Sequence, residues 1–312
     1  MRVRVPCARP GDTIDIVAPA SACSPEALAA GAAVLKEWGY RPRIPPDLFE
    51  GRGITAAPDP SRYRMLARAL RRSDSRVIWC ARGGYGSQRL LPRLARRPLP
   101  DRPKLLVGFS DVTALHVFIN QHWGWPTLHA ATLSDLGSGR LSQTALGELR
   151  AMVAGRTSRV TFRLQPLNAA ARRPRTVSGR LVGGNLKTIQ SLAGTPWGLR
   201  PAGCILVVED TGERGYAIDR MLVQLSQAGM LRGVRALVFG QFTRGLEPDG
   251  RFTGTEVIAR FAERLRVPAL RGAPIGHGDS ARAVLLGRPA SIELAPEAAC
   301  LSVAWTPEAV AG

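Results

Sequence analysis

Residues 104–116 read KLLVGFSDVTALH, and this stretch decides the fold class. The apolar run Lys104–Phe109 predicts a buried strand, and Asp111–Trp123 predicts a helix that follows at once. The same strand-then-helix pattern occurs at Thr13–Val17 and at Arg76–Ala81. Such repeated short steps predict an α/β fold with a parallel sheet and helices on both of its faces. Ligands bind at the carboxyl ends of strands in such sheets, which is where Ser110 lies.

The chain has 312 residues, which is enough for two domains. We expect an N-terminal domain over residues 1–155, a linker over residues 156–178 and a C-terminal domain over residues 179–312. The linker is expected because this stretch is polar and basic, contains Pro166 and Pro174, and has no clean hydrophobic period.

The chain is strongly basic, with a formal net charge of +19. A surface of this charge can attract nucleic acids or other polyanions. However, the basic residues are spread along the whole chain, and the densest cluster, Ala171–Arg175, lies in the expected linker. We therefore expect no specific nucleic-acid binding, whereas attraction to anionic substrates or surfaces stays open.

Hydropathy and cysteine usage indicate the cellular compartment. No apolar stretch approaches the roughly 20 residues that span a bilayer, and the basic start is not followed by the apolar run of a signal peptide. The five cysteines are odd in number and widely scattered, which favours reduced thiols over a disulfide framework. We therefore expect a cytoplasmic protein with no membrane partner.

Ser110 is the first candidate for catalysis. It lies on the turn between a predicted strand and a predicted helix, where a nucleophile elbow exposes its hydroxyl near helix N-terminal amides. The match to the G-x-S-x-G motif is half complete, because Gly108 is present but Val112 replaces the second glycine. An N-cap serine explains the same segment, and from this segment alone it is the favoured interpretation.

The second candidate is the glycine-rich loop ARGGYG, residues 81–86, which follows a predicted strand. Glycines let backbone N–H groups approach a phosphate, a carboxylate or a developing oxyanion. The loop lacks the spacing of a dinucleotide-binding motif, and a simple tight turn explains it equally well.

Glu209 and His277 complete the candidates. Glu209 ends a predicted buried strand, and His277 lies in a loop between two glycines. A solvated strand end and an ordinary loop histidine are the alternatives. The remaining histidines form no metal-ligand pattern with cysteines or acids, and GGNLKT, residues 183–188, has the wrong spacing for a phosphate loop. We therefore expect no metal and no cofactor.

Together these segments resemble the LD-carboxypeptidases, a family of serine peptidases that also includes the microcin C self-immunity proteins. The matching stretches follow one another over nearly the whole chain: Gly11–Ser21, Ala81–Pro92, Lys104–His116, Gly183–Leu186, Gly194–Trp197, Leu206–Asp210, Ile218–Leu222 and the pair Gly276-His277. The resemblance implies a flavodoxin-like N-terminal domain, a smaller C-terminal β/α domain, a homodimer and no metal.

The resemblance also implies the roles of the candidates. Ser110 falls on the nucleophile, Glu209 on the acid and His277 on the base. The implied activity is release of the terminal D-alanine from murein tetrapeptides, which cleaves an L-to-D peptide bond during cell-wall recycling. A related hydrolase of peptide–nucleotide antibiotics and a non-catalytic binder on the same scaffold are the alternatives.

Within this mechanism, the backbone N–H groups of Asp111 and of Gly83 or Gly84 are the expected oxyanion donors. Arg82 is the expected partner of the substrate's free carboxylate, since its planar fork suits that group, although a structural ion pair explains it at least as well.

Overall fold

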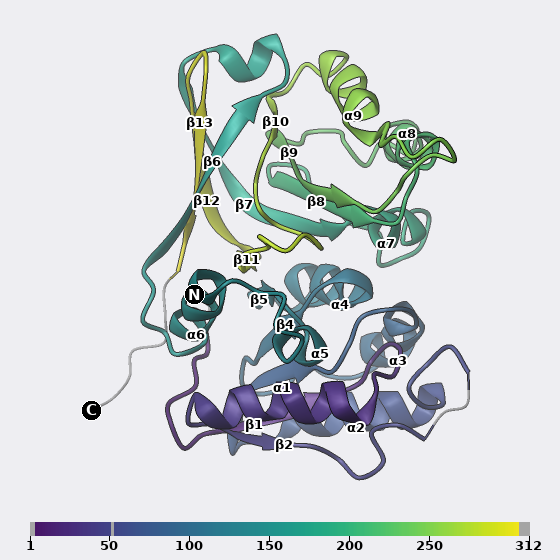
Figure 1. Ribbon diagram of the computed structural model, residues 1–312, viewed down its shortest axis with the longest axis vertical. Helices are drawn as coiled ribbons and strands as arrows, with labels where there is room; N and C mark the ends of the chain where they lie inside the picture. The colour runs from purple at the N-terminus through teal and green to yellow at the C-terminus, as the bar shows by residue number, and fades with distance from the viewer. Residues whose placement is uncertain (1–3, 51–52, 306–312) are drawn as a thin grey trace. The chain divides into compact units, whose positions relative to one another are not determined.

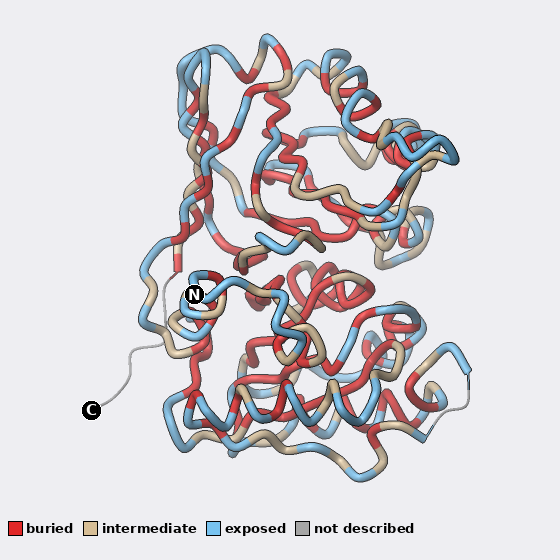
Figure 2. The backbone as a smooth tube through the Cα atoms, viewed as in Figure 1, coloured by how far each residue is buried: buried red, intermediate tan, exposed pale blue. Residues whose placement is uncertain are grey.

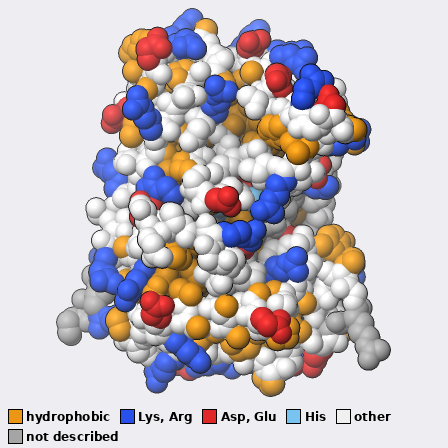
Figure 3. Space-filling model, in the orientation of Figure 1, with side chains coloured by type: hydrophobic (Ala, Val, Ile, Leu, Met, Phe, Trp, Pro, Cys, Tyr) orange, Lys and Arg blue, Asp and Glu red, His pale blue; other side chains and the backbone are white. Residues whose placement is uncertain are grey.

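The computed structural model describes residues 4–50 and 53–305, and the chain divides into two compact units (Figure 1). Of the described residues, the first unit comprises those up to Ser158 together with Trp305, and the second comprises Arg159–Ala304. Among the described residues, every helix is too short or too polar to traverse a lipid bilayer. On the face drawn in Figure 3, Lys and Arg side chains are scattered over the surface and form no single stripe.

The first unit is built on a parallel sheet with the strand order β2-β1-β3-β4-β5. These strands are β1 (Thr13–Val17), β2 (Arg41–Arg43), β3 (Ser75–Cys80), β4 (Leu105–Gly108) and β5 (Thr127–His129). The helices of this unit are α1 (Pro25–Glu37), α2 (Asp59–Arg71), α3 (Leu91–Ala95), α4 (Thr113–Phe118), α5 (Leu133–Leu136) and α6 (Gln143–Val153). The central strands are buried along nearly their whole length (Figure 2), as is typical of parallel strands.

Local signals in the sequence place these elements. Ser24 caps α1, because its Oγ accepts a hydrogen bond from the Ala27 N–H at 3.2 Å, and Pro25 occupies the first turn. The segment after Ser110 differs from the single helix expected over Asp111–Trp123. It consists of the 3₁₀ turn η2 (Ser110–Val112), α4 and the π-helical turn η3 (Ile119–Trp123).

The second unit is a closed barrel of mixed strands in the order β10-β6-β13-β12-β7-β8-β9. Its strands are β6 (Arg159–Pro166), β7 (Arg175–Asn185), β8 (Ile205–Thr211), β9 (Ala236–Thr243), β10 (Ala269–Arg271), β12 (Arg288–Leu294) and β13 (Ala299–Ala304); β11 (Val284–Leu286) lies outside the barrel. The pairs β7–β8, β8–β9 and β9–β10 are parallel, and the other neighbouring pairs are antiparallel. The helices are α7 (Leu186–Ser191), α8 (Gly215–Gln227) and α9 (Gly254–Glu263).

The linker expected over residues 156–178 is wrong. This stretch contains all of β6 and the start of β7, separated by the short 3₁₀ turn η4 (Ala169–Arg172). Along β6 the buried residues Val160, Phe162 and Leu164 alternate with exposed ones. The stretch therefore has the period of two of a half-buried strand, and its arginines occupy the outward positions.

The carboxyl end of β7 approaches that of β8 closely. Gly183 has φ of +135°, and a Cβ atom there would lie 1.8 Å from the Val207 carbonyl oxygen, so no side chain fits. The parallel register pairs Asn185 with Glu209. Gly183 therefore serves close strand packing, and polar residues follow at the ends of both strands.

Candidate active site

Ser110 lies on a sharp turn after β4. Its φ of 62° is in the left-handed region, which costs a residue with a side chain about 1–2 kcal/mol. Phe109 before it is extended, with φ of −154°. Both η2 and α4 begin without a side-chain hydrogen bond at their caps. The N-cap explanation of Ser110 therefore fails, and the strained strand-to-helix turn has the form of a nucleophile elbow.

The backbone of Gly83 packs directly against Ser110. A Cβ atom at Gly83 would lie 2.8 Å from Ser110 Cβ and 3.0 Å from Ser110 Oγ. Real side chains do not approach so closely, so the glycine-rich loop is required next to the serine. This contact places the main chain of the loop beside the hydroxyl, as a donor to a developing oxyanion must be.

Ser21 fixes this loop and was not singled out as a residue from the sequence. Its N–H donates to the Gly83 carbonyl at 3.1 Å, and its Oγ accepts from the Tyr85 N–H at 3.1 Å. The same hydroxyl donates to the Ile54 carbonyl at 2.6 Å. Gly84 has φ of +99°, and a Cβ atom there would lie 2.4 Å from Ser21 Oγ. The segment after β1 therefore holds both glycines in place.

Asp111 contacts the end of this loop, and Arg82 is part of it. The Asp111 carboxylate is buried and accepts the Ser87 N–H at 2.8 Å. Burial raises the pKa of Asp111, and hydrogen bonds from Ser87 and Gly86 oppose the rise. The Asp111 side chain thus joins the Ser110 turn to the end of the glycine-rich loop. Arg82 is exposed, and its Nη1 donates to the Ala22 carbonyl at 2.7 Å.

In the second unit, Glu209 and His277 form a hydrogen-bonded pair. His277 Nδ1 lies 2.7 Å from Glu209 Oε2. Glu209 is fully buried on β8, whereas the His277 side chain is 14% exposed, so the imidazole can be reached by a reactant. A carboxylate on Nδ1 fixes the tautomer and the orientation of the ring and leaves Nε2 for proton transfer.

Two neighbours hold the His277 loop in position. Gly276 has φ of +140°, and a Cβ atom there would lie 3.0 Å from Glu209 Oε2. Gln241, at the end of β9, accepts the Gly278 N–H on Oε1 at 3.0 Å and donates from Nε2 to Ser280 Oγ at 2.8 Å. Its backbone N–H donates to the Ile275 carbonyl at 2.8 Å. Gln241 therefore clamps both sides of His277, a role that no local sequence signal indicates.

Asp210, next to Glu209, organises the end of β7. Its carboxylate accepts hydrogen bonds from Asn185 Nδ2 at 3.0 Å, from the Lys187 N–H at 2.9 Å and from the Thr211 N–H at 2.8 Å. Burial, and then the charge of Glu209, raise the pKa of Asp210 to about 6. In the part of the chain that the structure describes, no group of three or more His, Cys, Asp or Glu residues could hold a metal ion.

Comparison with known proteins identifies the family. The family model described as the LD-carboxypeptidase N-terminal domain matches residues 14–130, and that of the C-terminal domain matches residues 178–292. The murein tetrapeptide carboxypeptidase of Pseudomonas aeruginosa is 32% identical over 296 residues, which cover 90% of this chain and 92% of that protein. The chain belongs to the LD-carboxypeptidase family. This confirms the family assignment and the serine-peptidase class expected from the sequence motifs.

Two further relatives agree with this assignment. A probable murein peptide carboxypeptidase of Bacillus subtilis is 30% identical, with coverage of 93% of this chain and 92% of that protein. The crystal structure of muramoyltetrapeptide carboxypeptidase from Oxalobacter formigenes matches with a TM-score of 0.82 at 28% identity, covering 95% of this chain and 100% of that one. Structures of the microcin C7 self-immunity protein MccF, at 19% identity and a TM-score of 0.83, share the fold.

In this LD-carboxypeptidase, the candidate residues are divided between the two family domains. Ser110, Gly83 and their neighbours lie in the segment that matches the N-terminal model, whereas Glu209 and His277 lie in the segment that matches the C-terminal model. The structure places Gly83 against Ser110 and His277 against Glu209. The meeting of the serine with the histidine stays a prediction.

Proposed function

We propose that this chain releases the terminal D-alanine from murein tetrapeptides, hydrolysing the L-to-D peptide bond during cell-wall recycling. The names of the Pseudomonas and Oxalobacter relatives support this substrate. The hydrogen bond of 2.7 Å between Glu209 and His277 carries the proposal. A buried carboxylate on Nδ1 is the arrangement that prepares an imidazole to act as a general base.

In the proposed reaction, Ser110 Oγ attacks the carbonyl carbon of the scissile bond while His277 Nε2 takes its proton. The imidazolium then donates this proton to the leaving nitrogen of D-alanine, and Glu209 stabilises the positive charge in the interval. A water molecule attacks the acyl-enzyme in the same way, and its proton passes through His277 back to Ser110 Oγ. The tripeptide product leaves with a free carboxylate.

The backbone N–H groups of Asp111 and of Gly83 or Gly84 are the proposed oxyanion donors. The tight packing of Gly83 on Ser110 supports this role, and the loss of one such donor costs about 3 kcal/mol of transition-state stabilisation. Arg82 is the proposed partner of the substrate's terminal carboxylate. Only its Nη1 is hydrogen-bonded within the described chain, to Ala22, so the rest of the guanidinium fork stays available.

The finer structural expectations are part of the same proposal. The strand order β2-β1-β3-β4-β5 supports a flavodoxin-like first unit. Five free cysteines support action in the cytoplasm. A homodimer is proposed from the family resemblance alone, and light scattering of the purified chain would measure it directly.

The test is incubation of the protein with a murein tetrapeptide, followed by measurement of free D-alanine. We expect release by the native chain and none by Ser110→Ala. A fluorophosphonate probe should label Ser110 in the native chain and leave Ser110→Ala unlabelled. If the probe labels Ser110 but the tetrapeptide is untouched, the serine is reactive and the substrate is wrong. If Ser110→Ala retains near-normal turnover, Ser110 is not the nucleophile.

A further inference from the structure

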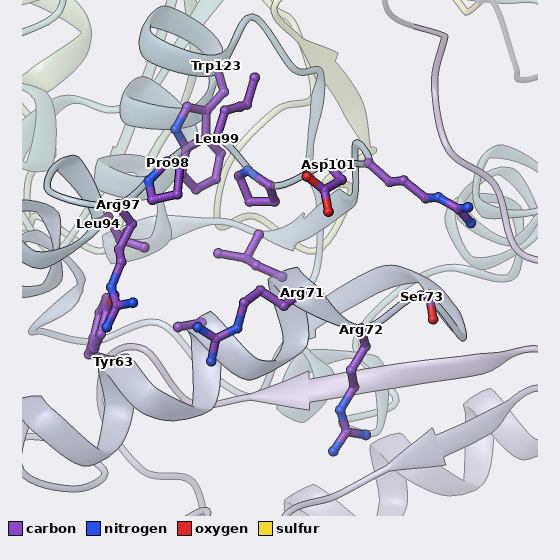
Figure 4. Close-up of a pocket in the computed structure, with 14 residues that line it drawn as sticks. Tyr63, Arg71, Arg72, Ser73, Leu94, Arg97, Pro98, Leu99, Asp101 and Trp123 are labelled. Carbon is purple, nitrogen blue, oxygen red and sulfur yellow. The ribbon is translucent and has the colours of Figure 1, made fainter.

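A cavity of about 490 Å³ lies in the first unit, and none of its walls belongs to the residues proposed for the reaction (Figure 4). Its walls come from α2, from the end of α3, from the loop before β4 and from Trp123. That loop precedes β4, whereas Ser110 follows it, so the loop and Ser110 lie at opposite ends of the strand. The volume is within the range of about 300–1,000 Å³ that is common for small-molecule sites.

The cavity combines apolar walls with unneutralised positive charge. Leu70, Leu94 and Leu99 line it, and Leu99 is 52% exposed. Arg71 and Arg97 also line it, and among the described residues their side chains make no ion pair and no hydrogen bond.

Three other charged residues of the walls leave the cavity positively charged. Arg72 differs from Arg71 and Arg97, because it pairs with Asp15 at 3.4 Å and points away from the cavity in Figure 4. Asp101 contributes one carboxylate to the walls, and Arg102 contributes a further cation. The cavity is therefore cationic overall.

Tyr63 adds an aromatic side chain to the walls of the cavity. The residue is only 7% exposed and lines the cavity, yet its hydroxyl has no hydrogen-bond partner within the described chain. Because the hydroxyl itself is buried, Tyr63 contributes to the walls through its ring. The guanidinium of Arg93 lies 6.0 Å from the centre of the Tyr63 ring, which adds positive charge beside it.

We propose that this cavity binds a small organic anion, in which an aromatic or other apolar body carries a carboxylate, phosphate or sulfonate. The leucines, Tyr63 and Trp123 would take the apolar body. Arg71 and Arg97 would take the anionic group, since guanidinium forks match its oxygens. This second site is separate from the proposed hydrolytic site and does not depend on it.

The test uses 8-anilinonaphthalene-1-sulfonate, an aromatic anion whose fluorescence rises on binding, beside its uncharged analogue N-phenyl-1-naphthylamine. We expect the native chain to bind the sulfonate at one saturable site and more tightly than the uncharged compound. The double variant Arg71→Gln/Arg97→Gln should bind the sulfonate about tenfold more weakly and the uncharged compound nearly unchanged. Its D-alanine release without the probe should be normal.

Two controls make the outcome specific. Arg232→Gln/Arg260→Gln removes two exposed arginines of the second unit, lowers the net charge equally and should bind like the native chain. Tyr63→Phe keeps the aromatic wall and removes only the buried hydroxyl, so it should also bind like the native chain. Equal sulfonate affinity in the native chain and the Arg71/Arg97 variant would overturn the proposal. Labelling Ser110 with the fluorophosphonate should leave sulfonate binding unchanged. If labelling abolished that binding, the proposal would also be overturned, because the sulfonate would then bind in the hydrolytic site.

Discussion

Replacement of Gln241 by alanine should impair catalysis much more than folding. The side chain makes two hydrogen bonds, to the Gly278 N–H at 3.0 Å and to Ser280 Oγ at 2.8 Å, on the far side of His277 from Ile275. Each bond is worth about 1 kcal/mol net, so the free energy of unfolding should fall by about 1–2 kcal/mol. The bond from the Gln241 N–H to the Ile275 carbonyl belongs to the backbone and persists in the variant.

The effect on catalysis should be larger, because the variant loses the precise position of the His277 imidazole. Without the Gln241 side chain, the Gly278 N–H and the Ser280 hydroxyl lose the hydrogen bonds that fix the loop on one side of His277, so the imidazole is less well positioned. A displacement of about 1 Å of a catalytic group can cost about 100-fold in rate. We therefore expect kcat/KM for tetrapeptide hydrolysis to fall by about 10- to 100-fold, mainly through kcat, since Gln241 is proposed to position His277 rather than to touch the substrate.

The assay compares D-alanine release and urea unfolding in three variants. Gln241→Glu keeps an acceptor for the Gly278 N–H and should recover most of the activity. Ser280→Ala removes only the outer partner and should lose less than Gln241→Ala. A Gln241→Ala enzyme with native kcat/KM would refute the reasoning, because the clamp would then be irrelevant to the position of His277. The reasoning would also fail if the free energy of unfolding of Gln241→Ala fell so far that unfolding alone explained the lost activity.

Three further predictions concern the surrounding residues. Gly83→Ala should leave the chain folded but reduce kcat by at least about 100-fold, because the new Cβ would lie 2.8 Å from Ser110 Cβ; near-native kcat would contradict the close packing. Asp210, with its pKa raised to about 6 from 3.8, holds a proton in the folded chain between about pH 4 and 6 that the unfolded chain has lost. The free energy of unfolding should therefore fall by up to about 3 kcal/mol as the pH rises through this window, and urea titrations at several pH values should find this slope missing in Asp210→Asn. Burial raises the pKa of the Cys80 thiol far above its usual value. An aromatic disulfide reagent should therefore label Cys80 only after unfolding, and labelling of the native chain at the rate of a free thiol would contradict its position in the core.

Local chemistry made much of this structure predictable. The strand at Thr13–Val17 is as the sequence predicts, and Ser24 caps α1 through a hydrogen bond to a residue three positions on, since each feature depends on neighbouring residues. Glu209 lies on the buried strand β8 as expected, although the strand continues through the buried Asp210 to Thr211. Where side-chain type, strand ends and glycine positions determine the outcome, short-range reasoning is sufficient.

Features that depend on long-range contacts were not predictable in this way. Gln241 reaches Gly278 across 37 positions, and Ser21 reaches Tyr85 across 64 positions. Neither glutamine nor serine carries a local signal for such a partner. The strand β6 was missed for another reason: its outward arginines made a half-buried strand resemble a basic linker, although Phe162 and Leu164 point into the barrel core.

The strain at Ser110 explains why the first unit needs so much support around one residue. A left-handed serine is less stable than an ordinary turn by about 1–2 kcal/mol, and the surrounding structure must offset this. Asp111 contributes a buried hydrogen bond to the Ser87 N–H, and Ser21 contributes bonds on both sides of Gly84. Gly83 packs so closely against Ser110 that no side chain fits between them. The conformation of the glycine-rich loop and that of the Ser110 turn therefore depend on each other. The hydroxyl and its proposed oxyanion donors are thus set by contacts within one unit, as the imidazole and its carboxylate are set within the other. Each half of the machinery is therefore ordered before substrate arrives, which lowers the reorganisation required during catalysis.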